Sequence, residues 1–350
     1  MKKTNLLAAV ILFIVIIFQP SELYPQNDKD STQKSIFDNV YDAISLGVVV
    51  RFGSELQSER ISGNNGFEFR AVRLRVGGEI SEDAGYFIQT SFIGSPILLD
   101  ARIYFQLSPG QFLDAGVFKA PFSREVLIST SDIDFVDRSV VTRLAPNRQL
   151  GVQFRGNLPG TAINFNAGVF NGNRFSNEGN DNNKMMYVSR VSYTPKLPGN
   201  KNSFEIALNF AYSEDKSVDI PGISNSFEGK RILFGSDTRL VFNNFLFTAE
   251  MIFGNFEPVG NSNFKPKSYQ VTAGYKFNEK IEVLIRKQEF NSDTFSPWIN
   301  QNILGVNYII NDYSQIQFNY VVPENSQFDE HLLLLNAQIA FKGKDLFIVD

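Results

Sequence analysis

The chain has 350 residues, no cysteine, one histidine and a formal net charge of -4 at pH 7. Without cysteine it cannot form a disulfide, a thiolate zinc site or a cysteine nucleophile, and a single histidine excludes a multi-histidine metal site. Its 33 Lys and Arg residues against 37 Asp and Glu give no basic surface of the kind that nucleic acid requires. Composition therefore excludes several kinds of catalytic and metal site and argues against a nucleic-acid-binding protein.

The first residues have the pattern of an export signal. Lys2 and Lys3 precede an apolar run of about 13 residues, which suits a signal peptide and is short for a membrane-spanning helix. We expect a signal peptide at residues 1–26, followed by a periplasmic lead-in at residues 27–42. An uncleaved N-terminal anchor is the alternative.

The rest of the chain is rich in aromatic residues, with 34 Phe and 12 Tyr, and it alternates apolar with polar residues in short stretches. In the clearest stretch, Leu99, Ala101, Ile103 and Phe105 face one way, and this period of two is typical of β-strands. The sequence predicts about sixteen strands, a porin-like number. They are expected at residues 43–52, 67–80, 86–92, 99–107, 113–118, 151–158, 162–170, 186–193, 204–212, 231–242, 245–253, 268–277, 281–290, 303–310, 315–322 and 332–341.

The connections between these stretches alternate in length. Those after even-numbered strands are short, such as residues 108–110, whereas most of those after odd-numbered strands are long and polar, such as residues 213–229; residues 94–96 are the exception. Short periplasmic turns and long outer loops are typical of outer-membrane barrels, and a soluble β-sandwich, the alternative, has no reason for them. We therefore expect an all-β transmembrane antiparallel β-barrel over residues 43–342, with a short periplasmic tail at residues 343–350.

One long insertion, residues 119–150, interrupts the rhythm of strands. Apolar residues such as Phe122, Val126, Phe135 and Leu144 exclude a disordered linker, so they need a surface to pack against. Folding inward against the barrel wall would bury them and leave the charged side chains facing a channel. The sequence therefore predicts an inward-folded constriction loop.

The charged residues of this insertion and of the polar strand faces are the candidate site. The insertion carries five Lys or Arg and four Asp or Glu, an excess of one positive charge. The arginines could attract anions, or pair with lumenal carboxylates without a transport role, and those of the insertion could tether it to the wall. The predicted pore-constriction and lumen residues are Lys119, Arg124, Arg138, Arg143, Arg148, Arg73, Arg75, Arg102, Arg155, Glu125, Asp132 and Asp137.

Four motifs in the N-terminal half resemble those of one family. They are G-x-F-K-x-P-F at residues 116–122, Asp-Arg-Ser at 137–139, A-P-x-R-x-L-G-V-Q at 145–153 and G-V-F-N-G at 168–172. Together they make roughly residues 67–172 similar to the phosphate-selective porin O and P family of bacterial outer membranes. The resemblance implies a trimer of water-filled, sixteen-stranded barrels, each narrowed by its third outward loop, and passage of anions.

These patterns predict a porin in the bacterial outer membrane. It would let small hydrophilic solutes diffuse passively, with a mild preference for anions, among which the family suggests phosphate. Its expected partners are those solutes or inorganic anions, outer-membrane lipid and two further copies of itself, with no enzyme activity, cofactor, metal or nucleic acid. The alternatives are a barrel with a plugged lumen that serves a structural or adhesive purpose, and a lipid hydrolase that uses His331 at one rim.

Overall fold

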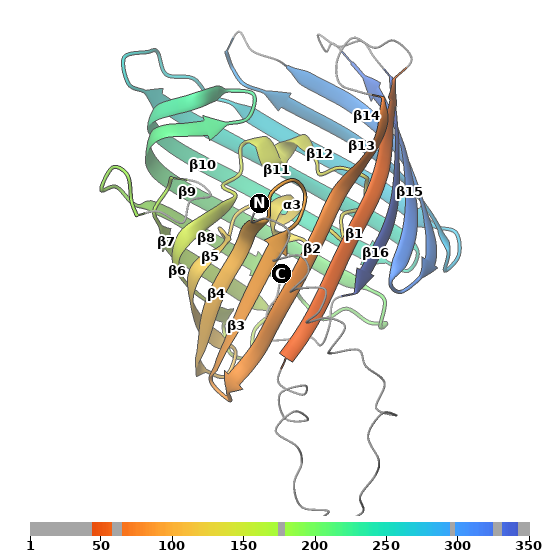
Figure 1. Cartoon of the computed structure of the whole chain (residues 1–350), viewed down its shortest axis with the longest axis horizontal. Helices are drawn as coiled ribbons and strands as arrows, with labels where there is room; N and C mark the ends of the chain where they lie inside the picture. Colours follow the sequence, from red (N-terminus) through yellow and green to blue (C-terminus); the bar gives the residue numbers. More distant parts are fainter. Residues whose placement is uncertain (1–43, 58–64, 174–178, 295–297, 325–330, 342–350) are drawn as a thin grey trace, which may run out of the picture. The chain divides into compact units, whose positions relative to one another are not determined.

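The computed structural model describes residues 44–57, 65–173, 179–294, 298–324 and 331–341, and in these residues sixteen strands close into a barrel (Figure 1). The predicted signal peptide, lead-in and C-terminal tail lie outside the described residues. The strands are β1 Ile44–Gln57, β2 Gly66–Ser81, β3 Ala84–Ser91, β4 Ile97–Ser108, β5 Gln111–Lys119, β6 Arg148–Asn157, β7 Ile163–Phe170, β8 Met186–Tyr193, β9 Ser203–Ile220, β10 Ser224–Phe242, β11 Phe245–Pro258, β12 Lys267–Lys276, β13 Ile281–Asn291, β14 Ile299–Asn311, β15 Ser314–Pro323 and β16 Leu332–Phe341.

Each strand pairs in an antiparallel manner with its neighbours in sequence, and β1 closes the ring against β16 in a register that runs from Val48 opposite Phe341 to Gln57 opposite Leu332. A closed ring leaves no edge strand, so the backbone groups of the wall can bond to one another inside a lipid bilayer. The prediction of a sixteen-stranded antiparallel barrel is confirmed. Of the described helices, none combines the length and the apolar content needed to cross a membrane.

The two faces of the wall differ in chemistry, as the alternation in the sequence predicts. On β4, Ile103 is 48% exposed and Phe105 is 44% exposed, whereas Asp100 and Arg102, on the opposite face of the strand, are buried. Exposed apolar side chains on the outside suit contact with lipid, and polar side chains on the inside suit a water-filled lumen.

One connection differs from the prediction. Residues 213–229 do not form a long loop, because β9 and β10 continue as a paired ribbon to Ile220 opposite Ser224, with only residues 221–223 between them. Val218, Ile220 and Phe227 are each less than 5% exposed and belong to an apolar cluster inside the barrel. The polar residues between them conceal this alternation in the sequence.

Residues 120–147 connect β5 to β6 and contain two short helices, α3 Arg124–Leu127 and η2 Val140–Arg143. This insertion bonds to strands far from β5 and β6 in the ring. The Val136 amide donates to Asn319 of β15 at 2.7 Å, and Gln338 of β16 donates to the Ser131 carbonyl at 2.9 Å. Asn319 and Gln338 are buried inner-face residues of the wall, so the insertion lies along its polar inner side (Figure 1).

Apolar clusters fix the insertion to part of the wall. Phe122, Val141 and Leu144 are fully buried in one cluster that includes side chains of β7 to β11 and β13, and Phe135 and Val136 pack in a second that includes side chains of β11 and β13 to β16. These inward-facing apolar residues supply the surface that the insertion needs to bury its own. Among the described residues of β3 to β6, Phe118 of β5 is the one that belongs to either cluster.

Candidate functional site

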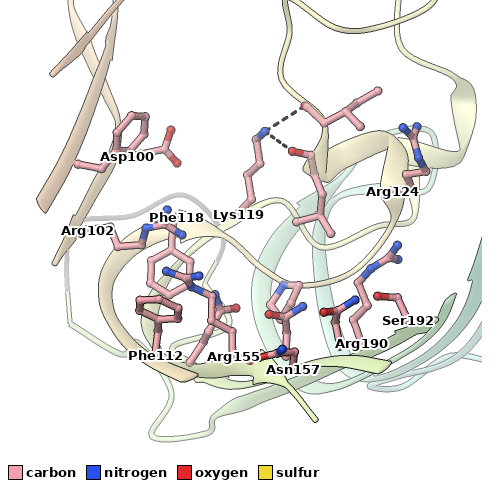
Figure 2. Close-up of a pocket in the computed structure, with 18 of the residues that line it drawn as sticks. Asp100, Arg102, Phe112, Phe118, Lys119, Arg124, Arg155, Asn157, Arg190 and Ser192 are labelled. Carbon is pink, nitrogen blue, oxygen red and sulfur yellow. Dashed lines mark hydrogen bonds between the residues drawn. The ribbon is translucent and has the colours of Figure 1, made fainter. Parts of the chain in front are cut away.

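A cavity of about 550 Å³ lies between the insertion and the wall formed by β3 to β9 (Figure 2). Residues 118–128 line it from the insertion side, and inward-facing residues of the strands line it from the other side. Its lining includes six cationic side chains and two carboxylates. They are Arg102, Lys119, Arg124, Arg148, Arg155, Arg190, Asp100 and Glu205.

Two carboxylates behind the lining hold three of these arginines in place. Asp114 has no exposed surface; it accepts a hydrogen bond from the Arg155 Nε at 2.7 Å, and the Arg102 Nη1 lies 3.7 Å from it. On the neighbouring part of the wall, Asp237 accepts from both terminal nitrogens of Arg190, at 2.5 and 2.8 Å. Removing one partner of a buried ion pair is costly, so these pairs keep the guanidinium groups at the lumen surface.

A fourth arginine, Arg148, is also held by a carboxylate. Its Nε and Nη2 donate to the two oxygens of Asp100, each at 3.0 Å, in the bidentate geometry that suits guanidinium and carboxylate groups. Two of the other arginines make cation–π contacts. The Arg155 guanidinium lies 4.3 Å from the centre of the Phe112 ring, and the Arg102 guanidinium lies 5.8 Å from the centre of the Phe118 ring.

Two of the lining cations lie where the insertion begins: Lys119 ends β5 and Arg124 begins α3. The Lys119 ammonium donates to the carbonyl oxygens of Leu127 and Ile128, at 2.7 and 3.0 Å, as the dashed lines in Figure 2 show. No hydrogen bond or ion pair joins the Arg124 side chain to the described residues; burial lowers its pKa, and the nearby Arg239 lowers it further. The lining thus holds six cations and two carboxylates, and Asp114 and Asp237 behind it pair with three of the arginines.

A second cavity, of about 480 Å³, has the opposite charge. It lies between residues 131–134 of the insertion and strands β13 to β16, and its charged lining is acidic. Arg239 pairs with one of these carboxylates, Asp134, at 2.9 Å. The acidic residues are Asp132, Asp134, Glu282 and Asp312. The insertion therefore borders a basic cavity along one part of its length and an acidic cavity along another.

The structure brings together only part of the predicted site. Five of the predicted residues line the larger cavity: Lys119, Arg124, Arg148, Arg102 and Arg155. One, Asp132, lines the smaller cavity. The other six line neither of these cavities: Arg73, Arg75, Arg138, Arg143, Glu125 and Asp137.

Glu125 and Arg138 hold the insertion together instead of facing a cavity. Glu125 is 3% exposed; its carboxylate accepts from the Ser139 amide at 2.7 Å and lies 3.6 Å from Arg286 of β13. Arg138 donates to the carbonyl oxygens of Glu125 and Ile128, and burial lowers its pKa. Any effect of these residues on a solute would act through the position of the insertion.

The remaining predicted residues also join the insertion to other parts of the chain. Arg73 donates to the Thr130 hydroxyl at 2.7 Å and Arg75 to the Ser129 hydroxyl at 2.5 Å. Asp137 accepts from Arg70 of β2 at 2.6 Å, and Arg143 lies over the ring of Phe290. These contacts correspond to the tethering alternative.

Several residues of the larger cavity do not appear in the predicted site. Asn157 on β6 and Asn164 and Asn166 on β7 present amides to it, and Phe87 on β3 presents a ring. Their position on the inward parity of their strands is the signal that could have found them, because Asn164 and Asn166 face the same way as the buried Gly168.

Comparison with known proteins finds one matching family model and several porins of similar fold. The model of the family described as phosphate-selective porin O and P matches residues 51–222. An anion-selective porin from Comamonas acidovorans has a TM-score of 0.66 and 11% identity, covering 85% of this chain and 99% of that one. Salmonella typhi OmpF has a TM-score of 0.62 and 13% identity, covering 85% and 97%. None of the curated proteins compared matches the chain.

The fold and the family match together define the class: the protein is an outer-membrane porin of bacteria. Residues 51–222 match the model of the phosphate-selective porin O and P family, the resemblance that the motifs predict. The solved structures, at these low identities, support the fold alone.

Proposed function

We propose that the protein is a passive diffusion channel for small hydrophilic solutes with a mild preference for anions. The observation that carries the proposal is the charge of the larger cavity's lining, which has six cationic side chains and two carboxylates. Passive diffusion transforms no solute, so no residue is assigned a catalytic role. The family name suggests phosphate as one of the anions.

The proposed path runs between the insertion and the wall formed by β3 to β9. The insertion packs its apolar side chains against β7 to β16, which occupies that part of the lumen. The larger cavity lies where Lys119 at the end of β5 and Arg124 on α3 come opposite arginines on the wall (Figure 2). In a narrow space with little water, a charge acts on a passing ion more strongly than it does in bulk solvent.

Two structural features bear on the rival functions. His331, which a lipid hydrolase would need as a base, lies 2.6 Å from the Tyr320 hydroxyl and stacks on the same ring, so a role at the rim accounts for its contacts. The apolar clusters inside the barrel favour a partly filled lumen, which is the geometry of a plugged barrel as well as of a constricted pore. Conductance separates these two.

The surrounding organisation is part of the same proposal. The proposed barrel spans residues 43–342 and contains the constriction loop at residues 119–150. A signal peptide at residues 1–26 and a lead-in at residues 27–42 precede it, and a tail at residues 343–350 follows it. We propose a homotrimer, since a fold relative, OmpT of Vibrio cholerae, is described in a trimer form; its TM-score is 0.57 at 10% identity, covering 85% of this chain and 99% of that one.

Removing two of the lining cations tests the anion preference. Lys119→Gln with Arg124→Gln should shift the reversal potential in a salt gradient toward cation selectivity, because it lowers the positive charge of the lining by two. The measurement is made on purified protein in planar bilayers. The matched control is Lys216→Gln with Lys265→Gln, which removes the same charge from exposed positions and should shift the potential much less. An equal shift in both variants would contradict the proposed path.

A further inference from the structure

The lining of the larger cavity combines cations with apolar surface. Besides its six cations, it includes side chains that carry no charge and no hydrogen-bonding group. These are Phe87, Phe112, Phe118, Pro121, Leu127 and Ile128. A path for small inorganic ions needs charge and water along its walls, and apolar side chains contribute nothing to such an ion.

Charge and apolar surface are placed next to each other on the insertion. Arg124 and Leu127 are the first and last residues of α3, three positions apart, so they lie on the same face of its single turn. Leu127 and Ile128 are half-buried, and their carbonyl groups hold the Lys119 ammonium. A bound anion at Arg124 and Lys119 would therefore have hydrocarbon beside it.

The opposite wall offers a matching surface. Phe87 of β3 shares the inward parity of Gln89 and is half-buried, so part of its ring faces the lumen. Phe112 and Phe118 lie beneath the guanidinium groups of Arg155 and Arg102, which gives this wall aromatic rings and cations in contact. The two rings are buried, so the surface offered above them is that of the guanidinium groups, which can stack on an aromatic ring as well as bind a negative charge.

We propose that the larger cavity is a binding site for organic anions that carry an apolar body, with aromatic carboxylates as the best-fitting class. The carboxylate lies at Lys119 and Arg124, and the ring lies between Leu127 and Phe87. This inference rests on the proposed channel function and names its preferred solute. It separates this pore from one built for inorganic phosphate, which has no apolar part to bury.

Block of the chloride current through single channels measures this preference. The purified full-length protein is studied in planar bilayers in potassium chloride, and benzoate, acetate or inorganic phosphate is added to one side. Benzoate should block at a concentration about tenfold or more below that of acetate, since burying even part of a ring is worth that factor. Equal block by benzoate and acetate would overturn the proposal, as would stronger block by phosphate than by benzoate.

Two variants remove apolar surface without touching a charge or an ion pair. Phe87→Ser and Leu127→Asn should each raise the half-blocking concentration of benzoate severalfold and leave that of acetate unchanged. The matched control, Ile309→Asn, makes the same kind of change in the smaller cavity and should leave benzoate block as it is. The assigned site is wrong if Ile309→Asn alone weakens block by benzoate. It is also wrong if neither Phe87→Ser nor Leu127→Asn weakens that block.

The same recordings distinguish this inference from the proposed function. A protein without conductance, or with no anion preference in the salt gradient, contradicts the channel proposal itself. An anion-preferring channel that treats benzoate and acetate alike leaves that function in place and rejects only the organic-anion site.

Discussion

Replacing residues 121–146 by Asn-Gly should raise the single-channel conductance severalfold. The Ala120 amide donates to the Asn147 carbonyl at 3.1 Å, so β5 and β6 already end side by side and a two-residue turn can join them. The replacement removes the segment that packs against the inner wall and leaves all sixteen strand pairings in place. Conductance is measured in planar bilayers, with native circular dichroism as the test that the barrel still forms.

Shortening an exposed connection provides the control. Residues 260–263, in the connection between β11 and β12, are exposed. Their removal should leave the conductance close to that of the unaltered protein. A folded barrel without residues 121–146 whose conductance is unchanged would mean that the insertion does not narrow the path. A folded barrel with no conductance at all would contradict the channel.

Ile103→Arg should destabilise the barrel by roughly 2 to 4 kcal/mol, the cost of placing an arginine on the lipid face near the middle of the bilayer. Ile103 lies midway along β4, opposite Ala115 of β5, and its side chain is 48% exposed on the outer face. Unfolding in urea from lipid vesicles, followed by the fluorescence of Trp298, gives the free energy.

The matched control places the same side chain on the inner face. Asn166→Arg adds an arginine to the lining of the larger cavity, where water and the carboxylates of the wall can receive it, and should cost much less. Similar losses in the two variants would show that the faces of the wall are assigned the wrong way round.

The strands could be predicted because one rule governs them. Residues that alternate between lipid and lumen leave a period of two in the sequence, and Leu99, Ala101, Ile103 and Phe105 keep this period without interruption. The rule failed between β9 and β10. There the inward-facing residues become apolar, as in Val218 and Ile220, while the residues between them are polar, so the two faces exchange their usual chemistry.

The site was less predictable because charge counts do not reveal pairing. Lys119 and Arg148 both belong to the insertion predicted from the sequence, yet Arg148 pairs with the Asp100 carboxylate, whereas Lys119 donates to the carbonyl oxygens of Leu127 and Ile128. Glu125 and Arg138 appear as charges available to a solute, and burial makes them anchors. Which charges remain for the solute depends on contacts between strands far apart in the chain, and a single sequence does not record them.

The route through the lumen can be measured directly, since the chain has no cysteine and a single introduced thiol has no competitor. Asn166→Cys places a thiol in the larger cavity and Ile309→Cys places one in the smaller cavity, both on wall strands. A bulky, water-soluble thiosulfonate reagent is added while current is recorded. We expect modification of Asn166→Cys to remove most of the current and modification of Ile309→Cys to change it little. Loss of current with Ile309→Cys but not with Asn166→Cys would contradict the proposed path between the insertion and the β3 to β9 wall.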